Sequence, residues 1–321
     1  MTSSLPQPTR EVFERFITTE YATIDARQQP IVWPVTPYYS PGAATIDVTT
    51  GIGYPKKADD ARRNPRVALL FSDPTGSGIE SGIQVLVQGT ADVDEEDLAA
   101  NRERYRREAA EKLPATKEML PPRWLEGLFS WYFERIYVKT RPERVFVWPT
   151  GDARAEPEVY DAHLEEVRSG RIEEALEPVE PAAGGGTAWD PRIEELGVRH
   201  SSAVLSWVAP DGFPLAVRVP VTLDREARRI RIGAEPAGLP LIDEGRACLV
   251  AHAHAPDFTW QENFQVRGDL VREGDGLALI PHKLLGGFEL PKESRLAGLR
   301  RNFSKARRFH RIAKERRAQS P

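Results

Sequence analysis

The chain has 321 residues, of which 40% are hydrophobic and 29% charged, so it can form two domains with cores of their own. These proportions are ordinary for a globular protein. The net charge of −4 is unevenly spread, because residues 291–321 hold eleven Lys or Arg and two Glu, a net +9, which leaves −13 for the rest. An acidic body argues against nucleic-acid binding by the main part of the chain.

The single cysteine, Cys248, lies in the apolar run 247–251 and has no second cysteine for a disulfide. We interpret it as a buried structural thiol in a reducing compartment. Residues 2–14 lack the apolar core of a signal peptide, and no apolar run approaches the ~20 residues that span a bilayer. We therefore expect a cytoplasmic protein without a membrane partner.

The first half reads mostly as short strands. Residues 9–19 predict a helix capped by Thr9, and residues 95–112 predict a highly charged helix. Segments rich in Val, Ile and Thr, bounded by Pro, Gly or Asp, predict strands at 21–25, 31–36, 45–50, 67–71, 84–93, 135–139 and 144–148. Such a series is typical of a β-barrel or sandwich. The aromatic insert at 124–137 is expected to pack on it, with Trp131 or Phe133 the best candidates for substrate contact.

The second half repeats the first. Residues 246–250 parallel 66–70 at an offset of 180, and residues 264–268 parallel 85–89 at an offset of 179. Offsets this steady favour a duplicated fold. We predict a mainly β (α+β) chain of two tandem barrels forming an intrachain pseudo-dimer, with peripheral helices and a C-terminal amphipathic helix. The domains would be 1–150, an acidic and Gly-rich linker at 151–190, and 191–321 with the basic helix.

The basic C-terminal segment has apolar residues at three- and four-residue spacing from Leu296 to Ala313, with Arg and Lys around them. We expect its apolar stripe to dock on the acidic body. Binding to RNA, DNA or an anionic membrane surface is the alternative.

The segment from Thr49 to Lys57 has the chemistry of a phosphate site. A strand stops at Thr49 and Thr50, passes through a loop holding Gly51 and Gly53, and delivers two lysines onto a short helix. Hydroxyls, flexible backbone and adjacent ammonium groups suit an anion such as phosphate. A solvated surface pair is the plain alternative. The pattern favours a phosphorylated cofactor or nucleotide as ligand.

Several ordered segments resemble the flavin-binding split-barrel family, which includes pyridoxamine 5'-phosphate oxidase. They are Gln29-Pro30, 31–35, 48–50, Lys56-Lys57, 64–69, 85–91 and 141–146, and the Asn-Pro-Arg-Val entry at 64–67 is the most specific. The resemblance covers residues 28–148 well and 204–281 more faintly. It implies six-stranded antiparallel split barrels that bind FMN, or in some branches the deazaflavin F420, at a dimer interface.

The resemblance also implies a set of cofactor contacts. Lys56 and Lys57 would hold the cofactor phosphate, with hydrogen bonds added by Thr49 and Thr50. The segment Trp33, Pro34, Val35, Thr36 would lie along the isoalloxazine, and Gln84 would touch the flavin. The lysine pair and Gln84 favour FMN over F420. In the second half, Glu235 and no cation stand where the lysines would be, so we expect one cofactor per chain.

The function expected is a flavin (FMN)-dependent oxidoreductase, with hydride transfer to or from an unidentified small molecule. The alternatives are an F420-dependent reductase and a non-catalytic flavin- or haem-binding protein. Catalytic residues stay unassigned, because no Ser-His-Asp, Cys-His or paired-carboxylate pattern is present. His252 and His254 share a strand face with Cys248 and suggest a metal or haem site, but an interdomain surface is preferred and no metal is assigned. A tandem chain serves as a monomer or as part of a homodimer.

Overall fold

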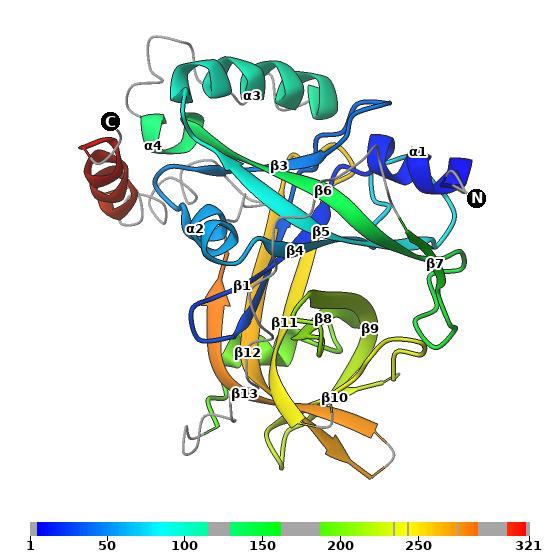
Figure 1. Ribbon diagram of the computed structural model, residues 1–321. Coiled ribbons are helices and arrows are strands. Elements are labelled where there is room, and N and C mark those ends of the chain that lie inside the picture. Colours follow the sequence, from blue (N-terminus) through cyan, green and yellow to red (C-terminus); the bar gives the residue numbers. More distant parts are fainter. Residues whose placement is uncertain are drawn as a thin grey trace.

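The computed structural model describes residues 5–114, 129–161, 187–233, 235–242, 244–274, 276–287 and 307–318. Two β-structures lie one against the other, with helices on the outer side of the first (Figure 1). Most of the predicted linker at 151–190 lies outside the described residues. The mainly β fold class is confirmed.

The first β-structure is a sheet built from residues 19–161. Its order is β2-β1-β4-β5-β6-β3, with β7 on the outer side of β6. The strands are β1 (Thr19–Ile24), β2 (Pro30–Val35), β3 (Ile46–Gly51), β4 (Arg66–Phe71), β5 (Gln84–Asp94), β6 (Arg135–Trp148) and β7 (Glu158–Asp161). Its helices are α1 (Gln7–Arg15), α2 (Lys56–Arg63), α3 (Leu98–Lys112) and α4 (Ser130–Phe133). Strand β7 thus brings part of the predicted linker into the first sheet.

The second β-structure is a closed barrel in the order β10-β13-β12-β11-β8-β9. Its strands are β8 (Ser202–Val208), β9 (Pro214–Asp224), β10 (Arg229–Ile232), β11 (Glu244–His254), β12 (Gln261–Glu273) and β13 (Gly276–Gly286), preceded by the 3-10 helix η3 (Pro191–Glu195). Strand for strand, this order matches that of the first sheet.

Both sheets carry the same irregularity. In β5 the register shifts at Gly89, which lies opposite Pro142, and in β12 it shifts at Gly268, which lies opposite Pro281. A Cβ at Gly89 would lie 2.1 Å from the carbonyl oxygen of Arg141, and one at Gly268 would lie 2.1 Å from that of Ile280. Proline has no N–H for the ladder, so a bulge beside it lets the strand continue. For this reason the two strands predicted at 135–139 and 144–148 form the single strand β6.

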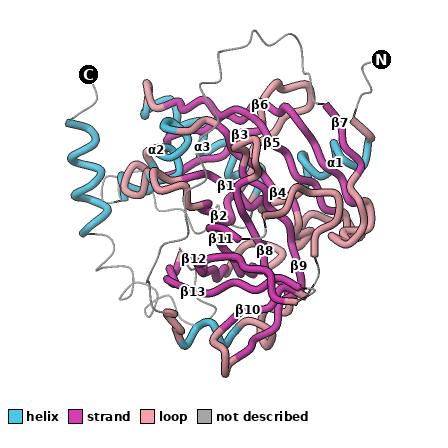
Figure 2. The backbone as a smooth tube through the Cα atoms, turned by 60° about the horizontal axis from the view of Figure 1, so that its bottom comes forward, coloured by secondary structure: helices cyan, strands magenta, loops and turns pink. Residues whose placement is uncertain are grey.

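The two β-structures share a buried apolar interface. Strand β2 lies beside β11 (Figure 2), while β4 and β1 pack on β9. Val32, Leu70 and Leu86 of the first sheet belong to the same core cluster as the second barrel. Cys248 is buried in this interface, and burial raises the pKa of its thiol to about 12. Polar side chains add to the contact, since Gln88 donates to the carbonyl of Pro214 at 3.0 Å.

The C-terminal helix at 307–318 docks on the first sheet. The Phe309 ring lies 5.1 Å from that of Trp131, and Ala313 is fully buried. Arg316 pairs with Asp59 at 2.8 Å, and Arg317 pairs with Glu134 at 2.8 Å. Docking on the acidic body is confirmed for these residues, while 296–306 lie outside the described part. No helix among the described residues is long and apolar enough to cross a membrane.

Candidate functional site

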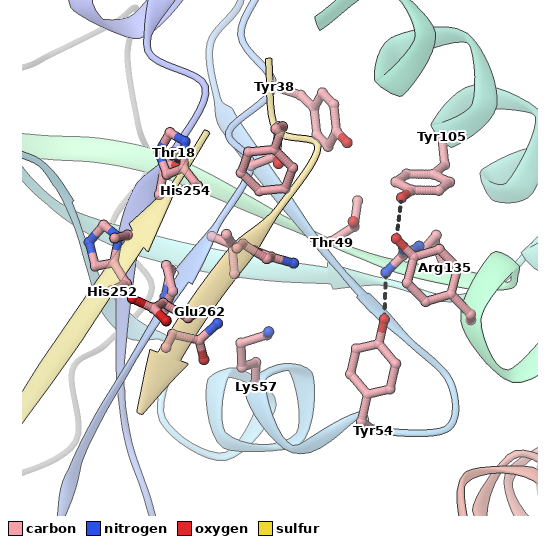
Figure 3. A pocket seen from close by; sticks show the side chains of 18 residues that line it. Thr18, Tyr38, Thr49, Tyr54, Lys57, Tyr105, Arg135, His252, His254 and Glu262 are labelled. Carbon is pink, nitrogen blue, oxygen red and sulfur yellow. Dashed lines mark hydrogen bonds between the residues drawn. The ribbon is translucent and has the colours of Figure 1, made fainter. Parts of the chain in front are cut away.

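A pocket of about 720 Å³, including the space at its open mouth, lies where the two β-structures meet (Figure 3). The first sheet and its helices supply one part of the lining: Thr18, Pro34, Val35, Thr36, Tyr38, Thr49, Tyr54, Lys57, Tyr105, Tyr132 and Arg135. Strands β11 and β12 and their connection supply the other part: His252, Ala253, His254, Phe258, Gln261, Glu262 and Asn263. Segments more than 200 residues apart in sequence therefore form one site.

The two predicted phosphate-binding lysines have different surroundings. Lys56 turns away from the pocket, and its Nζ lies 2.7 Å from Asp60 Oδ2 and 3.9 Å from Asp25 Oδ2. Lys57 lines the pocket and has no ion pair with any described residue. Burial, and next the charge of Arg135, lower the pKa of Lys57 to about 8. Lys57 is thus a cation held in a pocket without a counter-ion of its own.

Arg135, at the start of β6, is the second cation of the pocket. Its guanidinium lies 4.0 Å from the ring centres of both Tyr105 and Tyr132 and donates to the Tyr54 hydroxyl at 2.9 Å. The residue is 5% exposed, its Nε has no hydrogen-bond partner, and within the described residues it has no carboxylate partner. A buried charge without a counter-ion is costly unless a ligand supplies one. The sequence reasoning missed Arg135, because two of its three tyrosine partners, Tyr54 and Tyr105, are distant in the chain.

Five of the nine residues predicted to contact a cofactor line this pocket: Pro34, Val35, Thr36, Thr49 and Lys57. Four lie elsewhere. Thr50 points to the opposite face of β3 and donates to the carbonyl of Tyr54 at 2.9 Å. Trp33 packs against Gly287, since a Cβ added to that glycine would lie 2.9 Å from the Trp33 ring. Lys56 is paired as described, and Gln84 bridges the two β-structures by accepting from the backbone N–H of Arg218 at 3.0 Å.

The loop glycines have a packing role. A Cβ at Gly51 would lie 2.6 Å from the carbonyl oxygen of Trp131, and one at Gly53 would lie 2.9 Å from Cβ of Phe309. These glycines admit helix α4 and the helix at 307–318 close to the strand end. The loop that precedes helix α2 and Lys57 therefore packs against the aromatic side chains of Trp131 and Phe309.

A buried polar cluster joins the two β-structures beside the pocket. Glu20 of β1 is fully buried, and its Oε1 accepts from Ser72 at 2.8 Å and from Arg218 at 2.8 Å. The same oxygen lies 2.6 Å from Nε2 of His252. The sequence pointed to His252 and His254 as a pair on one strand face, and the structure places both in the pocket lining. Nothing in the sequence pairs them with Glu20.

The position of the second barrel that is related to Pro34 of the pocket lining holds a different residue. The register runs Leu70, Glu20, Pro34 across β4, β1 and β2, and it runs Val250, Val204, Arg218 across β11, β8 and β9. Arg218 thus stands where Pro34 stands at the pocket. Its guanidinium donates to Ser72 at 3.0 Å and to Glu20 at 2.8 Å.

Within the described residues, no group of three His, Cys, Asp or Glu side chains is arranged to hold a metal ion. Cys248, which the sequence places on the same strand face as His252 and His254, lies in the apolar interface and outside the pocket lining.

Comparisons with known proteins concern the fold. No family model matches the sequence, and no curated protein matches it. Similar solved structures include a Clostridium acetobutylicum protein related to general stress protein 26, of the pyridoxinephosphate oxidase family (13% identity, 48% of this chain and 92% of that one, TM-score 0.32). An F420 reductase is similar at 17% identity over 44% of this chain and 98% of that one, with a TM-score of 0.33.

A heme-binding protein from Mycobacterium smegmatis is similar at 14% identity over 50% of this chain and 60% of that one, with a TM-score of 0.34. Each of these three matches covers about half of the chain or less. At these identities and TM-scores the similarity concerns the fold alone.

Proposed function

We propose that the pocket binds one phosphorylated flavin-type cofactor per chain, FMN rather than F420, and that the protein is an oxidoreductase acting on a small molecule. The observation that carries this is the pair of cations Lys57 and Arg135, which line one end of the pocket without a carboxylate partner among the described residues. A phosphate group there would supply the missing counter-charge to the Lys57 and Arg135 side chains.

The rest of the lining fits the same ligand. Thr49 lies between Lys57 and Arg135 (Figure 3), and the segment Pro34–Thr36 also lines the pocket. The opposite wall, from β11 and β12, presents His252, Glu262 and Asn263, which are hydrogen-bonding groups suited to a polar ring edge. A bound flavin would supply hydride chemistry, and the chain would orient it and exclude water.

One cofactor per chain is supported by the contacts at the related position of the second barrel. Arg218, Ser72 and Glu20 are hydrogen-bonded to one another at the place related to the pocket, and a ligand would have to break these bonds to enter. Glu235, which stands in the second half where the lysines would be, pairs with Arg272 at 3.1 Å. A carboxylate would also repel a phosphate.

The test is binding of FMN, riboflavin and F420 to the purified protein, followed by flavin absorbance and by calorimetry. We expect FMN to bind at one per chain. Riboflavin, which lacks the phosphate, should bind about 10–100-fold more weakly, because charged hydrogen bonds contribute about 1.5–3 kcal/mol. Equal affinity for FMN and riboflavin would contradict the anion site. Tighter binding of F420 than of FMN would identify F420 as the cofactor instead. If none of the three compounds binds, the proposal is wrong.

A further inference from the structure

The two cations of the pocket come from segments that are far apart in the chain. Lys57 lies in helix α2 and Arg135 at the start of β6, and β4, β5, α3 and α4 lie between them in sequence. A phosphate that binds both needs each charged N–H group at about 2.7–2.9 Å. No local structure fixes the distance between the two charges, so their spacing depends on tertiary contacts.

The docked C-terminal helix contacts the segment that carries Lys57. Asp59, two residues after Lys57 in α2, accepts from Arg316 of the helix at 2.8 Å. In the loop before α2, the ring of Tyr54 lies 5.5 Å from the ring of Phe309. The C-terminal helix therefore contacts the chain both before and after Lys57.

The same helix contacts the chain immediately before Arg135. Glu134 accepts from Arg317 of the helix at 2.8 Å, and the Phe309 ring lies 5.1 Å from that of Trp131 in α4. Helix α4 has only four residues, and a single helical turn has little stability of its own. The position of α4, and with it the entry into β6, therefore depends on packing such as that of Trp131.

Two tyrosine rings connect the C-terminal helix with the guanidinium of Arg135. The Tyr54 hydroxyl accepts from Arg135 at 2.9 Å (Figure 3), while its ring packs on Phe309. The Tyr132 ring lies 4.0 Å from the guanidinium and 6.0 Å, edge to face, from the Trp131 ring. Because side chains in a protein interior are closely packed, displacement of the rings on the helix side also displaces the groups that hold the guanidinium.

We propose that Phe309 is a positioning residue of the anion site. By packing on Tyr54 and Trp131, its ring keeps the two cations at the spacing that a phosphate group requires. None of the described residues of the C-terminal helix lines the pocket, so the helix acts through these neighbours. The role rests on the proposed function, because it concerns the phosphate of the ligand. Loss of the Phe309 ring should therefore weaken recognition of the phosphate and leave binding of the flavin ring system unchanged.

The test is the ratio of the dissociation constants of riboflavin and FMN, measured by fluorescence titration of each full-length variant. Phe309→Ala should lower this ratio about 3–30-fold, the range for residues that act on a site through packed neighbours. Phe309→Tyr retains the ring and should keep the wild-type ratio. Phe213→Ala is the matched control and should also keep it, because it removes a buried ring that packs against Arg144 outside the pocket lining.

A double variant, Arg316→Ala with Arg317→Ala, gives an independent answer should Phe309→Ala fail to fold. It removes the ion pairs of the helix with the two segments that carry the cations, and it leaves the aromatic packing in place. The ratio should fall about 2–5-fold. Arg311→Ala removes an exposed charge from the same helix and should leave the ratio unchanged.

Two results would overturn the positioning role and leave the cofactor site standing. One is a wild-type ratio in every folded variant of Phe309, Arg316 and Arg317. The other is a fall in affinity by the same factor for FMN and riboflavin, because a smaller folded fraction weakens the binding of every ligand alike. Equal affinity of the wild type for FMN and riboflavin, or binding of neither, would overturn the proposed function, and this role with it.

Discussion

Lys56 and Lys57 are adjacent in the sequence, yet only Lys57 lines the pocket, while Lys56 Nζ lies 2.7 Å from the carboxylate of Asp60. We expect Lys57→Ala to weaken FMN binding about 10–100-fold, because it removes a charge-assisted contact to the phosphate. Lys56→Ala is the matched control and should change affinity less than about 3-fold. Fluorescence titration with FMN measures the affinity of both variants. A larger loss of affinity in Lys56→Ala than in Lys57→Ala would assign the phosphate contact to Lys56.

The affinity for FMN should fall as pH rises above about 8. The pKa of Lys57 is lowered to about 8 in the ligand-free protein, so above that pH the amine is neutral and must take up a proton before it can pair with a phosphate. The expected decline is up to tenfold per pH unit until the pKa of the bound state is reached. Lys57→Arg, which stays charged, should flatten this part of the profile. A profile of unchanged shape in that variant would exclude Lys57 as the titrating group.

Gln84 should matter for stability more than for affinity. Its amide joins β5 to Arg218 of the second barrel and to the carbonyl of Gly151, and the side chain lies outside the pocket lining. Gln84→Ala should lower the free energy of unfolding by about 1–3 kcal/mol, because the buried N–H of Arg218 loses its acceptor. Urea denaturation and FMN titration of one preparation separate the two effects. A loss of affinity for FMN at unchanged stability would show that Gln84 contacts the cofactor.

The docked C-terminal helix should stabilise the first sheet through Phe309. Its ring lies 5.1 Å from that of Trp131 and 5.5 Å from that of Tyr54. Phe309→Ala should cost about 2 kcal/mol, less than the 3–5 kcal/mol typical of a fully buried phenylalanine. Arg311→Ala on the same helix, where Arg311 is 73% exposed, should be within about 0.5 kcal/mol of wild type. Thermal and urea denaturation compare them.

The two bulge glycines should tolerate no side chain. Gly89→Ala places a Cβ 2.1 Å from the carbonyl oxygen of Arg141, so the strands must separate at that point. We expect a loss of about 2–4 kcal/mol. Gly276→Ala, in β13, is the control, since the nearest atom to its Cβ is 3.9 Å away. Equal stability of the two variants would show that β5 and β6 can move apart freely.

Much of the fold was predictable because strand patterns are local. Segments such as 67–71 and 84–93 alternate or cluster β-branched residues between Pro, Gly and Asp, and they form β4 and β5 almost as expected. The continuity of β6 was missed, because Pro142 is a strand breaker unless the register with β5 shifts beside it. That depends on Gly89, more than 50 residues earlier.

The candidate site was predictable in part. The lysine pair drew attention to the right loop, but successive helix residues point about 100° apart, so the sequence could not say which lysine meets the pocket. Arg135 carries no local signal of its burial, because Tyr54, Tyr105 and Tyr132 come from three separate segments. The pairing of His252 with Glu20 spans 232 positions and depends on how the sheets pack.

The strand orders of the two β-structures match, yet related positions hold different residues, such as Pro34 and Arg218. In a symmetric homodimer, any substitution that improved one wall of a site would appear at the same time in the second site. A single chain has no such restriction. Each half can therefore change its side chains independently, so that the two walls of one pocket come from two different sets of residues.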